Sequence, residues 1–102
     1  MDLSVLKKVG LSEGEIKIYQ ALLNLGKSPI NKIHEKTGME RRNIYDVLNK
    51  LIEKGLVVYT GENKKRRFNL SNPQKILSYL EEKNKTINNT KKEVADILPS
   101  LT

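Results

Sequence analysis

The chain has 102 residues and a formal net charge of +7, which suits one domain with one modest core. It contains no cysteine, which excludes disulfides and thiolate metal sites and favours a reducing compartment. Lys7 and Lys8 interrupt the apolar run that a signal peptide needs, and no stretch approaches the roughly 20 apolar residues of a membrane span. We therefore expect a cytoplasmic protein without a membrane partner.

The positive charge is concentrated in the middle of the chain. Residues 41–70 carry eight cations and three anions, whereas residues 1–40 and 71–102 each have an excess of only one cation. Such a concentration is typical of a nucleic-acid-binding face, with a solvated charge run as the alternative. The density peaks in "ENKKRRF", where four consecutive cations precede the only Phe, Phe68.

Apolar residues at helical spacing predict a helix in "LSEGEIKIYQALLNLG". Ser12 and Glu15 have the spacing of a capping box, and Gly26 can end the helix in the left-handed conformation. A short helix over 3–9, ending at Gly10, is expected to precede it.

A helix-turn-helix is predicted after a short extended stretch at "KSPI". Its first helix is expected to begin with Asn31 as the N-cap and to end at the Thr37–Gly38 pair. Its second helix is expected from Glu40 to Lys54, because apolar residues recur there on one face: Ile44, Val47, Leu48, Leu51 and Ile52.

A β-hairpin is predicted next, because the pattern changes to β-branched and aromatic residues at 57–60. Residues 61–65 form the expected turn and residues 66–70 the return strand. This places Lys64 and Lys65 at the tip of the hairpin, and Arg66 and Arg67 at the start of the return strand.

A long helix is expected from residue 73 to about Leu98, with Asn72 as its N-cap and Pro99 as its stop. It has a heptad seam suited to a short dimeric coiled coil, although a simply fraying helix end is the alternative. The seam consists of Leu77, Leu80, Asn84, Ile87, Lys91, Val94 and Leu98.

The predicted fold is therefore mainly α with a small β-hairpin: a winged helix-turn-helix over residues 1–72, followed by a C-terminal helix over residues 73–102. Catalysis is not expected. The single histidine, His34, has no metal-ligand or triad partner nearby in the sequence, the paired carboxylates suit helix caps and solvated faces, and there is no glycine-rich phosphate loop. We expect no enzyme, cofactor or metal.

DNA binding assigns tasks to the second helix of the helix-turn-helix, whose N-terminal half would enter the major groove. Base contacts are predicted for Arg41, Arg42, Asn43 and Asp46, and phosphate contacts for Tyr45, Asn49 and Lys50. Asp46 can instead pair with Arg42 along the helix, and Tyr45 can instead pack on the core. The wing cations Lys64, Lys65, Arg66 and Arg67 would reach the backbone or the minor groove.

The segments "LSEGEIKIYQALLNLG" and "INKIHEKTGMERRNIYDVLNKLIEKGLV" resemble the N-terminal winged helix of the TrmB-like family of archaeal transcriptional regulators. The resemblance implies operator binding, dimerisation through the last helix, and a recognition-helix pattern at Arg41, Arg42, Asn43, Tyr45 and Asp46. The wing is longer and more basic here than in the family. Many members carry a C-terminal sugar-binding domain, whereas this chain ends after the long helix, so we expect no small-molecule effector site.

The resulting hypothesis is a homodimeric, sequence-specific regulator that binds double-stranded DNA at an inverted repeat. The alternative is a winged helix used as a protein-interaction or general transcription module without a specific operator. RNA binding is less favoured, because the few aromatic residues fall mostly at core-like positions.

Overall fold

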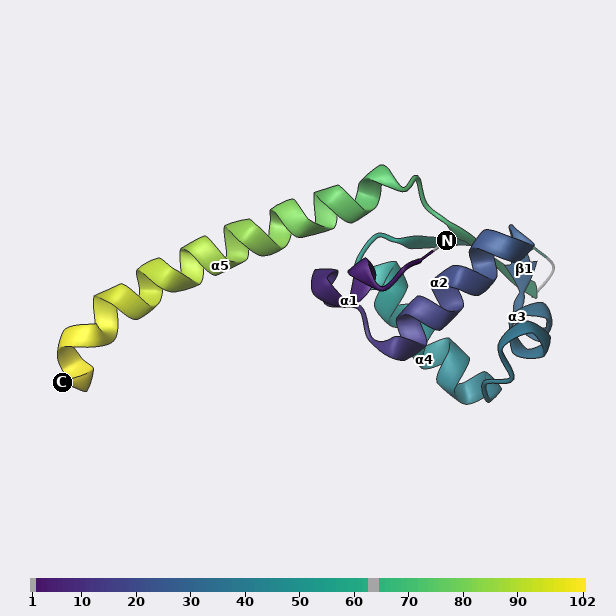
Figure 1. Cartoon of the computed structure of the whole chain (residues 1–102), viewed down its shortest axis with the longest axis horizontal. Coiled ribbons are helices and arrows are strands. Elements are labelled where there is room, and N and C mark those ends of the chain that lie inside the picture. The colour runs from purple at the N-terminus through teal and green to yellow at the C-terminus, as the bar shows by residue number, and fades with distance from the viewer. Residues whose placement is uncertain (1, 63–64) are drawn as a thin grey trace.

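The computed structural model describes residues 2–62 and 65–102 (Figure 1). Helices and a small antiparallel sheet form a winged domain, from which the last helix projects, as expected from the sequence. In chain order the elements are α1 (Val5–Val9), α2 (Glu13–Leu25), β1 (Ser28–Pro29), α3 (Ile30–Thr37), α4 (Arg41–Glu53), β2 (Val57–Glu62), β3 (Lys65–Leu70) and α5 (Gln74–Leu101).

The predicted capping box at the start of α2 is confirmed. The Glu15 amide donates to Ser12 Oγ at 3.1 Å, and the Ser12 amide donates to Glu15 Oε1 at 3.0 Å. These bonds satisfy two amides that the first turn of a helix otherwise leaves without partners. The short helix α1 also ends as expected, at Gly10 with a φ of 108°.

The start of α3 differs from the prediction. The helix begins at Ile30, directly after Pro29, and no side chain caps it, so the prediction that Asn31 is its N-cap was wrong. Pro29 already has an extended backbone, with φ of −76° and ψ of 169°, which is the conformation that an N-cap residue needs. Asn31 is therefore inside the first turn, and its side chain can bind elsewhere.

The sheet has the order β1-β3-β2, so the hairpin gains a third strand that the sequence did not predict. Ser28 pairs with Phe68 and Pro29 with Arg67, both antiparallel. Pro29 has no amide to donate, which suits its position on an edge strand. The hairpin strands are also longer than predicted. Lys65 lies in β3 opposite Glu62 instead of in the turn, and the predicted tip residue Lys64 lies outside the described residues.

The core lies between α2, α3, α4 and the sheet. Its most buried side chains come from each of these elements and from the segment before β2, and they include Ile18, Leu22, Ile33, Ile44, Leu48, Leu51, Leu56, Val57 and Phe68. The apolar face predicted for α4 is confirmed, with Ile52 at its half-buried edge.

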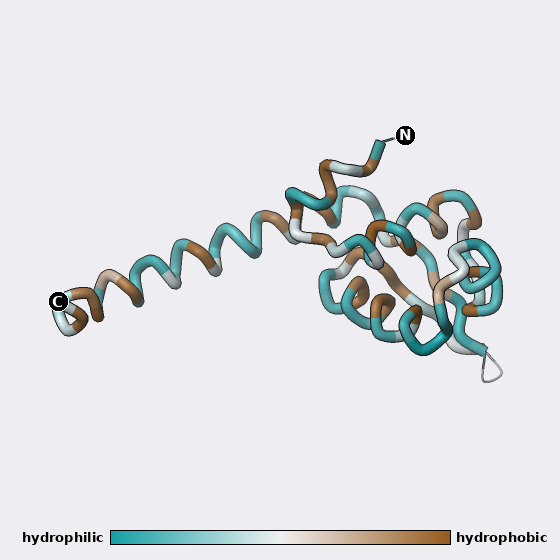
Figure 2. The backbone as a smooth tube through the Cα atoms, turned by 60° about the horizontal axis from the view of Figure 1, so that its bottom comes forward, coloured by the Kyte–Doolittle hydropathy of each residue, from teal (hydrophilic) through white to brown (hydrophobic). Residues whose placement is uncertain are grey.

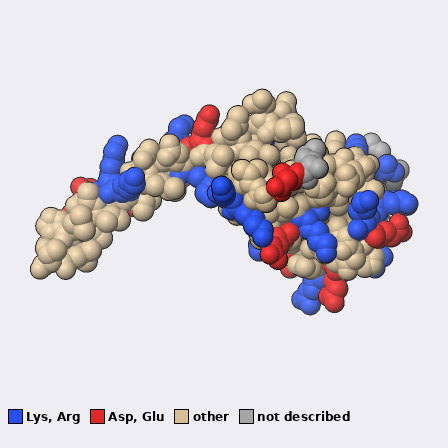
Figure 3. Space-filling model, viewed as in Figure 1, with Lys and Arg blue, Asp and Glu red and all other residues tan. Residues whose placement is uncertain are grey.

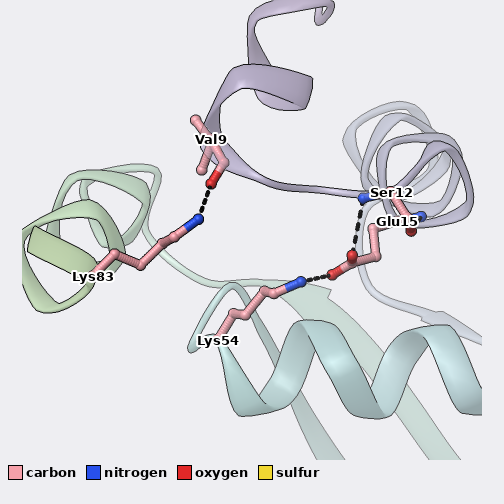
Figure 4. Close-up of polar contacts among 5 residues, drawn as sticks. All are labelled: Val9, Ser12, Glu15, Lys54 and Lys83. Carbon is pink, nitrogen blue, oxygen red and sulfur yellow. Dashed lines mark hydrogen bonds and ion pairs between the residues drawn. The ribbon is translucent and has the colours of Figure 1, made fainter. Parts of the chain in front are cut away.

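A charged pair is buried beside this core. Lys54 Nζ, at the end of α4, donates to Glu15 Oε2, and the Glu15 side chain is only 4% exposed (Figure 4). Burial alone raises the pKa of Glu15, but the hydrogen bonds from Lys54 and Ser12 together hold this pKa below its ordinary value of 4.5. The carboxylate therefore stays charged and joins the start of α2 to the end of α4.

The first turns of α5 pack on the winged domain. The helix begins at Gln74 with Pro73 as its N-cap, one residue later than predicted, and Asn72 Oδ1 accepts the Gln74 amide at 2.9 Å. Three side chains from these turns, Ile76, Tyr79 and Leu80, contact the core. One turn later, Lys83 Nζ donates to the carbonyl of Val9 at 2.9 Å (Figure 4).

The rest of α5 extends away from the domain, which gives a molecule of 55 × 32 × 25 Å. Hydrophobic segments recur along this projecting part (Figure 2). The prediction that Pro99 stops the helix was wrong, because α5 continues to Leu101 with Pro99 inside it. Proline removes one amide and clashes with the preceding turn, which bends a helix, and the C-terminal end of α5 bends in Figure 1. In the described part of the chain, no helix combines the length and apolar character needed to cross a membrane.

Replacing Lys54 with Met tests the buried pair. We expect Lys54→Met to lower the free energy of unfolding by about 2 kcal/mol at neutral pH, because the charged Glu15 then keeps only the capping box. The folded-state pKa of Glu15 lies below 4.5, so the stabilisation is present above this value and disappears as the pH falls through the folded-state pKa. Urea unfolding of both proteins across this pH range should show the difference shrinking in acid.

The control is Lys50→Met, one turn earlier on the exposed side of α4. It should change stability by less than about 0.5 kcal/mol. A Lys54→Met effect that does not depend on pH would contradict the role given to the Glu15 charge.

Candidate nucleic-acid interface

Side chains of α3 and the following residues hold the turn between α3 and α4. The Thr37 hydroxyl donates to the Ile33 carbonyl at 2.8 Å and accepts the Met39 amide at 3.2 Å. His34 Nδ1 lies 2.6 Å from the Met39 carbonyl, so a proton on Nδ1 completes this bond. Gly38 has a φ of 71°, a conformation that glycine adopts without strain. His34 thus has a structural role, because its hydrogen bond helps to fix the angle between α3 and α4.

The turn directs one face of α4 into solvent. Every residue predicted for DNA contact on this helix is exposed: Arg41, Arg42, Asn43, Tyr45, Asp46, Asn49 and Lys50. The helical period places Arg42, Asp46 and Asn49 in a row opposite the buried face, while Arg41 and Tyr45 lie on one flank of that row. The row can therefore enter a major groove without obstruction from the core.

One of these side chains makes a hydrogen bond within the protein that the sequence did not predict. Arg41 Nε donates to Asn31 Oδ1 at 3.3 Å, which links the first turn of α4 to the first turn of α3. The helical pair weighed for Arg42 and Asp46 is not among the ion pairs of the described residues. The exposed Asp46 carboxylate is thus available to accept from a base.

The wing presents its cations on two faces. Lys65, Arg66 and Arg67 are all exposed in β3, and Phe68 is buried. Because side chains alternate along a strand, Arg66 lies on the same face as Phe68, while Lys65 and Arg67 lie on the other face. The consecutive cations therefore alternate between the two faces of the strand.

Arg66 is positioned by an aromatic residue that the sequence did not single out. Its guanidinium lies over the Tyr59 ring, 5.2 Å from the centroid, and this ring is 6.2 Å from the ring of Phe68. Tyr59 is opposite Phe68 in the hairpin register. A cation over an aromatic ring is stabilised by about 0.5–1 kcal/mol at an exposed site, so Arg66 is partly ordered before any ligand binds.

The wing and the recognition helix meet at one open groove of about 580 Å³. Its lining comes from four elements: Pro29 of β1, Ile30 and Asn31 of α3, Tyr45 of α4, and Lys65, Arg66 and Arg67 of β3. Of the predicted site residues, the groove brings together Tyr45 and these three cations. The row of Arg42, Asp46 and Asn49 lies beside the groove and does not line it.

Charged residues gather at the end of the winged domain where α3 and the hairpin lie. Figure 3 shows Lys and Arg there, with Asp or Glu among them. A groove with cations and a tyrosine hydroxyl suits a phosphate backbone, to which such groups bind.

Asn31 and Pro29 were not predicted to contribute to this site. The sequence does not indicate their role, because they reach the site only through the pairing of β1 with β3. A two-residue strand is also too short to show an alternating pattern. The signal for Tyr59 is its place opposite Phe68, which becomes visible only once the hairpin register is known.

A helix-turn-helix followed by a β-hairpin, with an exposed and cation-bearing second helix, defines a winged-helix domain. The chain belongs to the TrmB family: the family model described as "Sugar-specific transcriptional regulator TrmB" matches residues 6–74. This match confirms the family indicated by the sequence, and it extends from α1 to the first residue of α5. No curated protein matches the chain.

Solved structures share the fold at low sequence identity. TrmBL2, an archaeal chromatin protein whose structure shows a novel mode of DNA binding, is 22% identical with a TM-score of 0.73 over 95% of this chain and 40% of that chain. ST1889 of Sulfolobus tokodaii is 19% identical with a TM-score of 0.64 over 81% of this chain and 86% of that chain. BpsR of Bordetella bronchiseptica, whose DNA binding is regulated by 6-hydroxynicotinic acid, is 15% identical with a TM-score of 0.61 over 81% of this chain. The chain spans 64% of the BpsR chain.

Replacing Thr37 with Val tests the turn that directs α4. We expect Thr37→Val to lower the free energy of unfolding by about 1–2 kcal/mol, because it removes one hydroxyl that makes two hydrogen bonds in a half-buried turn. Urea unfolding measures the change. The matched control is Thr86→Val on α5, whose hydroxyl makes a single exposed bond to the Glu82 carbonyl, and equal effects of the two substitutions would contradict the role of Thr37.

Proposed function

We propose that the protein is a cytoplasmic, homodimeric regulator that binds double-stranded DNA in a sequence-specific way. In this proposal the N-terminal half of α4 enters the major groove, and the wing binds the adjacent backbone or minor groove. The observation that carries the proposal is the single basic groove that joins Tyr45 of α4 to Lys65, Arg66 and Arg67 of the wing.

Base contacts are assigned to the exposed residues at the start of α4. Arg41 and Arg42 suit guanine, Asn43 suits adenine, and the Asp46 carboxylate can accept from cytosine. Arg42 and Asp46 are favoured most, because they lie in the row that points away from the core. Arg41 must first release Asn31, or bind the base together with it.

Phosphate contacts are assigned to Tyr45, Asn49 and Lys50 on α4 and to the wing cations, including Lys64. Tyr45 is 42% exposed, so its ring packs partly on the domain while its hydroxyl remains available. In this proposal, the width of the groove between Tyr45 and the wing sets the distance between the base contacts of α4 and the backbone contacts of the wing.

Dimerisation is assigned to the predicted seam of α5. The projecting part of this helix exposes apolar side chains that the winged domain does not cover, with Ile87 50% and Val94 44% exposed. Exposed apolar positions at helical spacing are typical of a helix that pairs with another helix. Within the seam, Leu80 packs on its own domain, so pairing would use the later residues. The proposal includes no small-molecule effector.

Alanine substitution separates the wing from the recognition helix. We expect the triple variant Lys65→Ala, Arg66→Ala, Arg67→Ala to weaken binding to all duplexes alike and to reduce the salt slope of log K by about 0.9 for each phosphate that the wing no longer neutralises. We expect Arg42→Ala to relax preference at one base position, by about 1–3 kcal/mol of discrimination. Both effects are measured by titrating labelled duplexes across a range of salt concentrations, with a single strand of equal length for comparison.

The control is Lys85→Ala, Lys92→Ala on α5, which removes charge away from the groove. It should leave the salt slope nearly unchanged. If the wing and control variants behave alike, the cations act only through net charge. Absent or strand-indifferent binding would instead favour the protein-interaction module.

A further inference from the structure

A side-chain hydrogen bond joins the first turns of the two helices of the helix-turn-helix. Arg41 Nε, on the first residue of α4, donates to Asn31 Oδ1, in the first turn of α3, at 3.3 Å. Both residues are exposed, so the bond lies on the surface and not in the core. Asn31 also lines the groove between α4 and the wing. It therefore belongs to the groove and also contacts the first side chain of the recognition helix.

The chemistry of the two groups fixes how the Arg41 guanidinium is presented. Arginine has only donors, so the Asn31 atom that faces Nε must be the amide oxygen. This bond uses the one proton on Nε and leaves the protons of the two terminal nitrogens for other partners. A guanidinium can bind the O6 and N7 acceptors of guanine with both terminal nitrogens, or with Nε and one of them. The bond to Asn31 leaves the first arrangement open and blocks the second.

Fixing the guanidinium before DNA arrives changes what the contact discriminates. A free arginine side chain on a helix surface samples many rotamers, and ordering it on binding costs free energy. A partner that holds Nε removes part of this cost, but only for ligands that suit the fixed geometry. The effect is therefore a gain in preference for one base, and not a uniform gain in affinity for all DNA.

We propose that Asn31 is a positioning residue for base recognition. It holds Arg41 so that the two terminal nitrogens of the guanidinium meet O6 and N7 of a guanine in the major groove. This inference rests on the DNA-binding function proposed above and adds a residue outside the recognition helix that determines specificity. Arg41 thus reads its base without releasing Asn31. Because Asn31 carries no charge, it acts through Arg41 and not through attraction to phosphates.

Arg42 provides an internal comparison for this role. It is the next residue of α4 and lies in the row opposite the buried face. Among the side-chain bonds of the described residues, Arg41 has its contact with Asn31, whereas Arg42 has no ion pair. Removing Asn31 should therefore affect the base that Arg41 reads and leave the base that Arg42 reads unchanged.

Selection from a pool of duplexes tests the role without a known operator. The probe is a labelled DNA duplex with a randomised central segment, and the bound fraction is sequenced for the unmodified chain and each variant. Arg41→Ala and Arg42→Ala identify the position that each arginine reads. We expect Asn31→Ala to weaken the guanine preference at the Arg41 position by about 2- to 10-fold, the factor typical of one hydrogen bond. The preference at the Arg42 position should stay as it is in the unmodified chain.

Asn31→Asp separates positioning from a loss of local structure. Its carboxylate still accepts the proton of Arg41 Nε, so the guanine preference should be kept, while the added negative charge lowers affinity for all duplexes. The salt slope of Asn31→Ala should match that of the unmodified chain, because no cation is removed. In the double variant Asn31→Ala, Arg41→Ala, the preference should equal that of Arg41→Ala alone.

The matched control is Asn24→Ala on α2, which removes an exposed asparagine that does not line the groove. It should leave every base preference unchanged. The positioning role is overturned if Asn31→Ala keeps every preference, or if it weakens binding to all duplexes alike. It is also overturned if Arg41→Ala keeps every preference, because Arg41 then reads no base. These results leave the DNA-binding function standing, whereas an unmodified chain that selects no duplex sequence overturns both proposals.

Discussion

The buried carboxylate of Glu15 joins the elements on which the rest of the structure depends. It caps the first turn of α2 through Ser12 and accepts a hydrogen bond from Lys54 at the end of α4. Lys54 also lies over the ring of Tyr79 in α5, 5.9 Å from its centroid. Because Lys54 is the C-cap residue of α4, before the short connection to β2, the same contact fixes where the recognition helix ends. Burying a charge is costly, and this one is compensated by two donors from different elements.

The recognition helix and the wing share one backbone framework. β3 lies in the centre of the sheet, with β2 on one side and β1 on the other, and β1 leads directly into α3. The hydrogen-bonded turn after α3 then sets the direction of α4. The backbone positions around the groove between Tyr45 and the wing cations are therefore fixed by strand pairing and by the turn after α3.

Local patterns in the sequence were enough to predict most elements, and the exceptions have a common cause. The capping box, the left-handed Gly38 and the apolar face of α4 are all encoded within a few residues of one another, whereas the left-handed conformation predicted for Gly26 was wrong, because this residue ends α2 with φ of 72° and ψ of −158°. The strand β1, the position of Tyr59 under Arg66 and the start of α3 directly after Pro29 depend on pairings between separate segments. Pro99 is the opposite case, in which a local pattern made a prediction that the structure does not follow. Proline usually stops a helix, but α5 continues past Pro99 to Leu101. The candidate site was predicted by residue type, whereas the groove that unites it was not.

In the proposed dimer, the direction of α5 controls the distance between the two DNA-binding surfaces. The first turns of α5 are held by apolar contacts to the core, and the last contact before the helix projects is the bond from Lys83 to the Val9 carbonyl. Tyr79 lies beside both Lys54 and Lys83, so the anchor of α5 is continuous with the buried pair that ends α4. A small change of angle at Lys83 would be amplified along the projecting helix, and the recognition helix of the other chain would move with it. The network from Glu15 through Lys54 and Tyr79 to Lys83 is thus the part of the molecule that would set the half-site spacing of an operator.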